Sequence, residues 1–149
     1  MFTGKKMALL LLTGIIAVLA NAQCDKNVKF VTEKVYQVKA DSSEGEGLPV
    51  SGNIRLSKES IFVSMLWQNG ETTEVRGSNA AIVCKMEQDF KNGTIDIIAE
   101  AEIKAHNQSS KTKMLFNIRS REGKIKVYAV PENESDKICF AIKEWQEIK

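Results

Sequence analysis

The segment TIDIIAEAEIKA, residues 94–105, decides the fold of this chain. Every second residue from Ile95 to Ala105 is apolar, and Ile98 is the one apolar residue among the polar positions between them. The apolar set is Ile95, Ile97, Ala99, Ala101, Ile103 and Ala105, and the polar set is Thr94, Asp96, Glu100, Glu102 and Lys104. A period of two is typical of a β-strand with one buried face. The segment therefore predicts a long strand, in which the small residues Ala99 and Ala101 mark a crowded point where another element or a ligand comes close.

The same alternation continues toward the C-terminus. Residues 111–119 and 124–130 each place apolar side chains at every second position, and the turn Ser120–Gly123 joins them. Two alternating runs across a short turn with glycine predict a β-hairpin. Residues 137–148 fit a strand through Ile138, Phe140 and Ile142 or a helix through Ile138, Ile142 and Trp145. We favour a strand over residues 137–143.

Similar but less regular patterns precede residue 94. Residues 61–67 alternate up to Trp67, and Asn69-Gly70 then predicts a tight turn into a returning strand over residues 72–76. A separate strand is expected over residues 81–90, and Asn92-Gly93 marks a second tight turn. Residues 35–40 and 54–57 are further expected strands, with a mobile polar loop over residues 41–47. Residues 28–38 fit a strand or a short helix.

These segments predict an all-β domain, an antiparallel meander of eight to nine strands. Turns recur at a spacing of roughly 8–12 residues, which is typical of a β-sandwich or barrel. An up-and-down meander is favoured over a Greek key, because nearly every connection reads as a hairpin. A closed or half-open barrel follows naturally, because closure removes exposed strand edges, and a sandwich is the alternative. Its shape would be similar to that of the calycins, the lipocalin and fatty-acid-binding barrels. No signature motif of a particular family accompanies this pattern.

The N-terminal segment MFTGKKMALLLLTGIIAVLANA, residues 1–22, has the layout of a secretory signal peptide. Two lysines precede an apolar run that is too short to span a membrane, and the small-x-small triplet Ala20-Asn21-Ala22 follows. Cleavage between Ala22 and Gln23 would leave one β-rich domain, residues 23–149. That domain would be periplasmic or at the cell surface, with no membrane span. A lipid anchor on Cys24 is disfavoured, because Gln23 precedes it.

Charge and cysteine content narrow the function classes. The chain has 21 Lys and Arg against 19 Asp and Glu, and the counts become equal once Lys5 and Lys6 are removed. A neutral domain argues against a nucleic-acid partner. Cys24, Cys84 and Cys139 are an odd number for an exported chain. Alternation places Cys84 and Cys139 on different faces, so we expect Cys84 to be a small buried hydrophobe, and Cys24 could reach Cys139 if the termini meet.

Catalytic and metal-binding patterns are sparse. His106 is the only histidine and lies in a loop-like stretch, while Glu100 and Glu102 share the polar face of one strand. The acidic loop over residues 41–46 lacks the ligand spacing of an EF-hand. No phosphate loop or dinucleotide-binding fingerprint occurs. We therefore expect no metal and no cofactor, and a hydrolase of unknown type is the least favoured hypothesis.

Two functional hypotheses remain ahead of an enzyme. The first is a non-catalytic binding module that contacts an envelope protein or a glycan through its rim loops. The second is a carrier of a small apolar ligand inside the barrel, where Ala99 and Ala101 would leave room. Candidate ligand or interface residues are Trp67, Ala99, Ala101 and Trp145.

Overall fold

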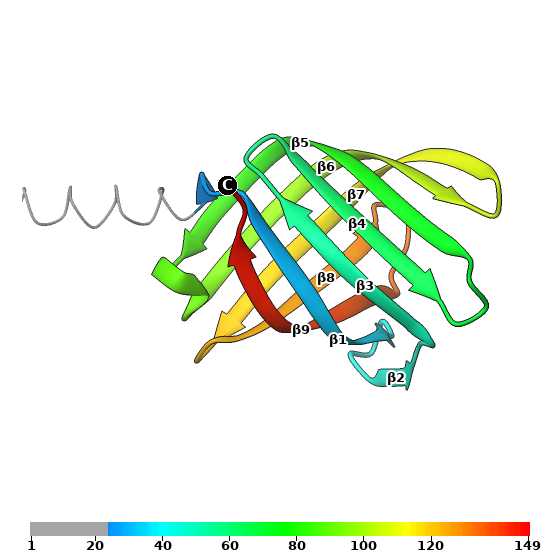
Figure 1. Ribbon diagram of the computed structural model, residues 1–149, viewed down its shortest axis with the longest axis horizontal. Helices are drawn as coiled ribbons and strands as arrows, with labels where there is room; N and C mark the ends of the chain where they lie inside the picture. The colour runs from blue at the N-terminus through cyan, green and yellow to red at the C-terminus, as the bar shows by residue number, and fades with distance from the viewer. Residues whose placement is uncertain (1–23) are drawn as a thin grey trace, which may run out of the picture.

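The computed structural model describes residues 24–149, which form a closed antiparallel β-barrel with one additional strand (Figure 1). The expected signal peptide and the cleavage point at Ala22 and Gln23 lie outside the described residues. The strands are β1 (Val28–Val38), β2 (Glu44–Gly47), β3 (Val50–Leu56), β4 (Ser60–Trp67), β5 (Thr72–Met86), β6 (Gly93–Ala105), β7 (Gln108–Arg121), β8 (Lys124–Pro131) and β9 (Lys137–Glu147). A 3₁₀ turn, η1 (Gln88–Phe90), joins β5 to β6. Within residues 24–149, no helix is long and apolar enough to cross a membrane.

The topology is the predicted meander. Each strand from β3 to β8 pairs with its successor, β1 pairs with β3, and β9 returns to pair with β1 along its whole length. Eight strands thus close the barrel, and β2 extends the sheet from the second half of β1. The structure resolves the choice between barrel and sandwich in favour of the closed barrel. It also resolves residues 28–38 and 137–147 as strands.

Three expectations about the first half of the chain are wrong. Residues 72–76 and 81–86 belong to one strand, β5, which contains a bulge between Asn79 and Ala81. A bulge inserts one extra residue into a strand. The inward side chains are therefore at odd positions before the bulge (Val75, Gly77) and at even positions after it (Ile82, Met86), which interrupts the alternation in the sequence. Residues 88–90 form η1 rather than strand. The expected loop over residues 41–47 contains the short strand β2.

Strand β1 bends where it leaves β3. Its first residues pair with β3 as far as Val31 opposite Asn53, and bulges then follow at Thr32. Thr32 Oγ1 accepts a hydrogen bond from Gly52 N (2.9 Å) and donates one to Gly52 O (2.8 Å). The Thr32 side chain thereby replaces backbone hydrogen bonds between β1 and β3 at the point where the two strands separate. The segment that connects β1 to β3 contains β2 and forms part of the barrel rim.

Side chains fill the barrel interior. Phe30, Phe116 and Phe140 are each at most 2% exposed, together with isoleucines from β3, β4, β6 and β7. Ala99 is fully buried and Ala101 is 4% exposed. A Cβ atom built on Gly77 would lie 2.9 Å from Ile61 Cγ2 and 3.1 Å from Ala99 Cβ. The crowding expected around Ala99 is therefore produced by neighbouring strands.

One end of the barrel is closed by the N-terminal segment and η1. Cys24 forms a disulfide with Cys84 on β5, with Cα atoms 6.3 Å apart. Phe90 in η1 packs edge-on against Phe30 (ring centroids 5.2 Å apart) and Trp145 (4.9 Å). Ser120 donates a hydrogen bond to Phe90 O. These contacts hold Cys24, the end of β9 and the β5–β6 connection at the same end of the barrel (Figure 1).

The disulfide corrects the expectations for the cysteines. Cys84 shares the inner face with Ile82 and Met86, as alternation predicts, but it is bonded to Cys24. Cys24 therefore does not reach Cys139, which is a free buried thiol. Cys24 precedes β1, so alternation within strands carries no information about its partner.

Candidate functional site

The open end of the barrel, opposite η1, carries the β4–β5 and β6–β7 turns (Figure 1). A shallow hollow of about 540 Å³ lies there, between the start of β3 and the end of β4. It is lined mainly by apolar residues: Leu48, Pro49, Val50, Leu66 and Trp67, with Ser51, Gln68 and Gly70 at its edge. We call this set the Trp67 hollow.

Backbone hydrogen bonds hold the walls of the Trp67 hollow together. Val50 pairs with Trp67 across β3 and β4, and Gln68 N donates to Pro49 O (3.0 Å). Trp67 N donates to Glu71 O (2.9 Å) and closes the β4–β5 turn. The hollow is thus built on a strand pair and a tight turn, so its shape is largely set before any partner binds.

Trp67 is one of the residues that line this hollow. Its Nε1 donates a hydrogen bond to Thr73 Oγ1 (3.0 Å), so the polar group of the ring is satisfied within the protein. Leu66, which precedes it on β4 and points to the other face of the strand, is 52% exposed. Tryptophan is enriched in protein contact sites. Sequence alternation identified Trp67, but the contribution of Leu48 and Pro49 depends on the path of the chain after β2.

A second hollow, of about 640 Å³, lies across the β4–β5 turn from the first. His106 Nδ1 lies 3.0 Å from Glu71 Oε2 there, so the β6–β7 turn contacts the β4–β5 turn. Glu102 accepts a hydrogen bond from Ser109 Oγ (2.8 Å), and this bond, with help from Lys104, lowers the pKa of Glu102. A general acid needs a raised carboxyl pKa, so Glu102 lacks the environment of that role.

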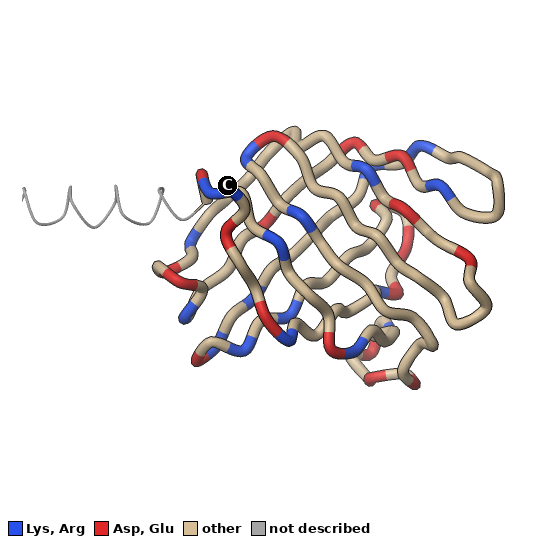
Figure 2. The backbone as a smooth tube through the Cα atoms, in the orientation of Figure 1, with Lys and Arg blue, Asp and Glu red and all other residues tan. Residues whose placement is uncertain are grey.

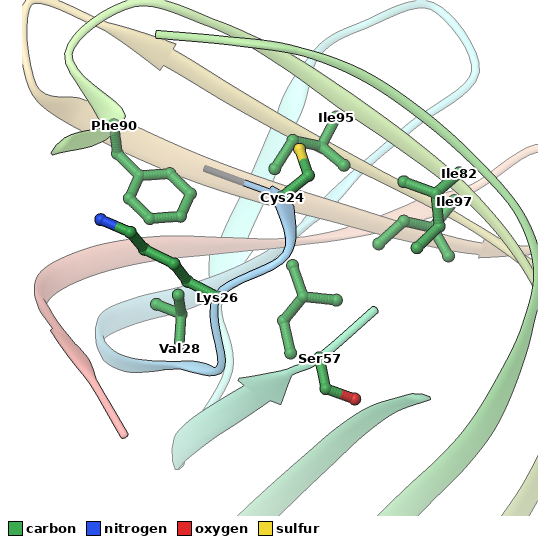
Figure 3. Close-up of a pocket in the computed structure, with 9 residues that line it drawn as sticks. Cys24, Lys26, Val28, Ser57, Ile82, Phe90, Ile95 and Ile97 are labelled. Carbon is green, nitrogen blue, oxygen red and sulfur yellow. The ribbon is translucent and has the colours of Figure 1, made fainter. Parts of the chain in front are cut away.

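The remaining candidate residues lie away from the rim. Ala99 and Ala101 face the filled core, and Trp145 packs against Phe90 at the closed end. Near that end, Cys24, Val28, Phe90 and Ile97 help to line an enclosed pocket of about 10 Å³. Phe90 and Val28 lie on one side of it and Ile82 and Ile97 on the other (Figure 3). Such a volume holds about one water molecule, whereas sites for drug-sized ligands measure roughly 300 Å³ or more.

A cluster of tyrosines covers Cys139 on the outer face of the barrel. Tyr36 and Tyr128 are the cross-strand neighbours of Cys139, and Tyr36 Oη lies 3.3 Å from Glu44 Oε1 of β2. Burial raises the pKa of all three groups, Tyr36, Tyr128 and Cys139. A buried thiol with a raised pKa is mostly in its less reactive protonated form.

Within the part of the chain that the structure describes, no group of three or more His, Cys, Asp or Glu side chains is arranged to hold a metal ion. No protein-family model, no curated protein and no solved structure matches this chain.

Proposed function

We propose that this protein is an exported, non-catalytic binding module that recognises a partner protein through the Trp67 hollow. The observation that carries the proposal is the apolar lining of this hollow at the open rim, with Leu66 52% exposed. Exposed apolar surface costs free energy in water, and contiguous patches of it mark interaction sites. A partner that inserts an apolar side chain beside Trp67 would remove this surface from water.

Two further observations support parts of this proposal. The Cys24–Cys84 disulfide suits an oxidising compartment, as does the signal-like segment over residues 1–22. Lys, Arg, Asp and Glu are distributed over the whole barrel (Figure 2), so the outer surface as a whole does not select a strongly charged partner. A protein partner is favoured over a glycan, because the indole Nε1 already donates to Thr73 and is not free to bind a sugar hydroxyl.

The interior carrier is less well supported. The small residues that suggested internal space, Ala99 and Ala101, are packed against the Ile61 and Gly77 region, and the enclosed pocket near Phe90 is about 10 Å³. A carrier would have to expand its core to admit a ligand, and well-packed cores resist such expansion.

The proposal is tested by site-specific photo-crosslinking in the native host. A photoreactive residue at position 66 is expected to capture a defined partner, and Leu66→Asp is expected to abolish co-purification of that partner. Lys58, between β3 and β4, is the control position, because its side chain is 73% exposed and it lies outside the Trp67 hollow. Equal capture of the same partner from positions 66 and 58 would contradict the proposal. Capture of a glycan instead of a protein would contradict the proposal of a protein partner.

A further inference from the structure

The outer faces of β6 and β7 separate the two signs of charge onto neighbouring strands. The outward residues of β6 include Asp96, Ile98, Glu100 and Glu102, and those of β7 include Lys111, Lys113, Leu115 and Asn117. Strand pairing places Ile98 opposite Leu115, Glu100 opposite Lys113 and Glu102 opposite Lys111. One strand of the hairpin is therefore acidic around an isoleucine, and the other is basic around a leucine.

An exposed apolar row crosses this face. Ala81, Ile98, Leu115 and Val130 are successive cross-strand neighbours on β5, β6, β7 and β8. Ile98 and Leu115 are each 39% exposed, and Val83, two residues from Ala81, is 54% exposed. Outward positions of a barrel are normally polar, so a contiguous aliphatic row there suggests a contact surface.

We propose that this face binds the same face of a second copy of the chain, about a two-fold axis parallel to the strands and between β6 and β7. Such a rotation lays β6 of one copy over β7 of the other. Ile98 then meets Leu115 of the second copy, Glu100 meets Lys113, and Glu102 meets Lys111. Each contact occurs twice, as an isologous interface requires. The occupant is thus selected by charge complementarity of the face with itself.

The alternative two-fold arrangement is unfavourable. An axis perpendicular to the strands, along the apolar row, would bring Glu100 of one copy toward Asp96 of the other, and like charges would face each other. Two sheets that pack face to face keep their strand directions within about 30° of each other, and both axes satisfy this rule. The charges therefore select the axis between β6 and β7.

The complementarity has a limit that sets the size of the interface. Beyond Asp96 and Asn117, Lys85 on β5 would lie over Lys126 on β8 of the second copy, so the contact ends there. Residues 96–102 over four strands span about 24 by 19 Å, so at most about 450 Å² on each copy is in contact, because the outer face of a closed barrel curves away. Stable interfaces bury about 1,600 Å² in total, so we expect a weak dimer that dissociates on dilution.

Charge exchange between copies tests this interface. Analytical ultracentrifugation of the purified protein from micromolar to millimolar concentration is expected to show a reversible monomer–dimer equilibrium. Glu100→Lys places two lysines together across the interface, and Lys113→Glu places two glutamates together, so each variant alone is expected to be monomeric. An equimolar mixture of the two is expected to dimerise, because both contacts then join opposite charges. The double variant E100K/K113E is expected to dimerise for the same reason.

Control variants separate this result from general effects of charge or misfolding. Glu46→Lys on β2 makes the same change in net charge at an exposed position outside the face, and it should dimerise like the unmodified protein. Leu115→Asp should weaken the dimer, whereas Leu66→Asp should not. A monomer at every concentration would overturn the proposal, as would a dimer that survives both single charge changes in variants with unchanged circular dichroism.

Discussion

Removal of the Cys24–Cys84 disulfide should destabilise the barrel by about 4 kcal/mol. The bond joins residues 60 positions apart, so it closes a loop that includes β1 to most of β5. In the chain-entropy treatment, closing a loop of that length lowers the entropy of the unfolded chain by about 14 cal/mol/K, or about 4 kcal/mol at 25 °C. Domains of this size have total stabilities of only about 5–15 kcal/mol. The disulfide thus supplies a large part of the free energy of unfolding.

Urea unfolding followed by tryptophan fluorescence measures this effect. With an m-value of about 2 kcal/mol/M, the double variant C24A/C84A should unfold at a midpoint about 2 M lower than the oxidised protein. A reducing agent should produce the same shift in the unmodified protein and no shift in the double variant. Because the loss arises in the unfolded state, the native circular dichroism spectrum should be unchanged.

A small shift would refute this reasoning. If the midpoint falls by less than about 0.5 M at an unchanged m-value, the loss is below about 1 kcal/mol. The unfolded chain would then not be gaining the expected freedom, and the closed end would be held by the packing of Phe90 and Trp145 alone.

Three other predictions concern stability. Gly77→Ala should cost about 1–3 kcal/mol in urea unfolding, since its Cβ would lie 2.9 Å from Ile61 Cγ2, while the same change at exposed Gly47 should cost less. Phe90→Ala should cost about 3–5 kcal/mol and alter the fluorescence of Trp145, which the ring contacts. Burial raises the pKa of Tyr36, so above about pH 10 the unfolded chain loses a proton that the folded chain keeps. The urea midpoint should therefore fall as pH rises from 10, and Tyr36→Phe should make that fall shallower.

Much of the barrel was predictable because one buried face imposes a period of two. Residues 94–105, 111–119 and 124–130 all lie within observed strands, and their predicted inward residues Ile95, Phe116 and Val127 are buried. Ile98 broke the pattern, and it does so because it faces outward with 39% of its surface exposed. The exception was therefore a property of the outer surface and not a fault in the strand.

The incorrect predictions concern places where a bulge changes which residues of a strand face inward, and places where the chain lies outside the predicted strands. The bulge after Asn79 reverses the inward parity of β5, and an alternation count cannot distinguish that from two separate strands. The cysteine pairing depends on where the segment before β1 crosses the barrel end, which strand patterning does not describe. The Trp67 hollow depends likewise on Leu48 and Pro49, which follow the unpredicted strand β2.

The outer surface shows why alternation alone stops short of function. A period of two says that Ile98, Glu100, Lys113 and Leu115 face solvent, but each strand taken separately has only a mixed polar face. The β6–β7 register aligns the acidic strand with the basic one and Ile98 with Leu115. A shift of that register by two residues would keep every side chain on the same face, yet it would bring Ile98 beside Lys113 or Asn117 and break the apolar row. Since burial of the inner face constrains only the parity of the register, the aligned outer face is a separate feature of this sequence, and the proposed self-complementary interface would make use of it.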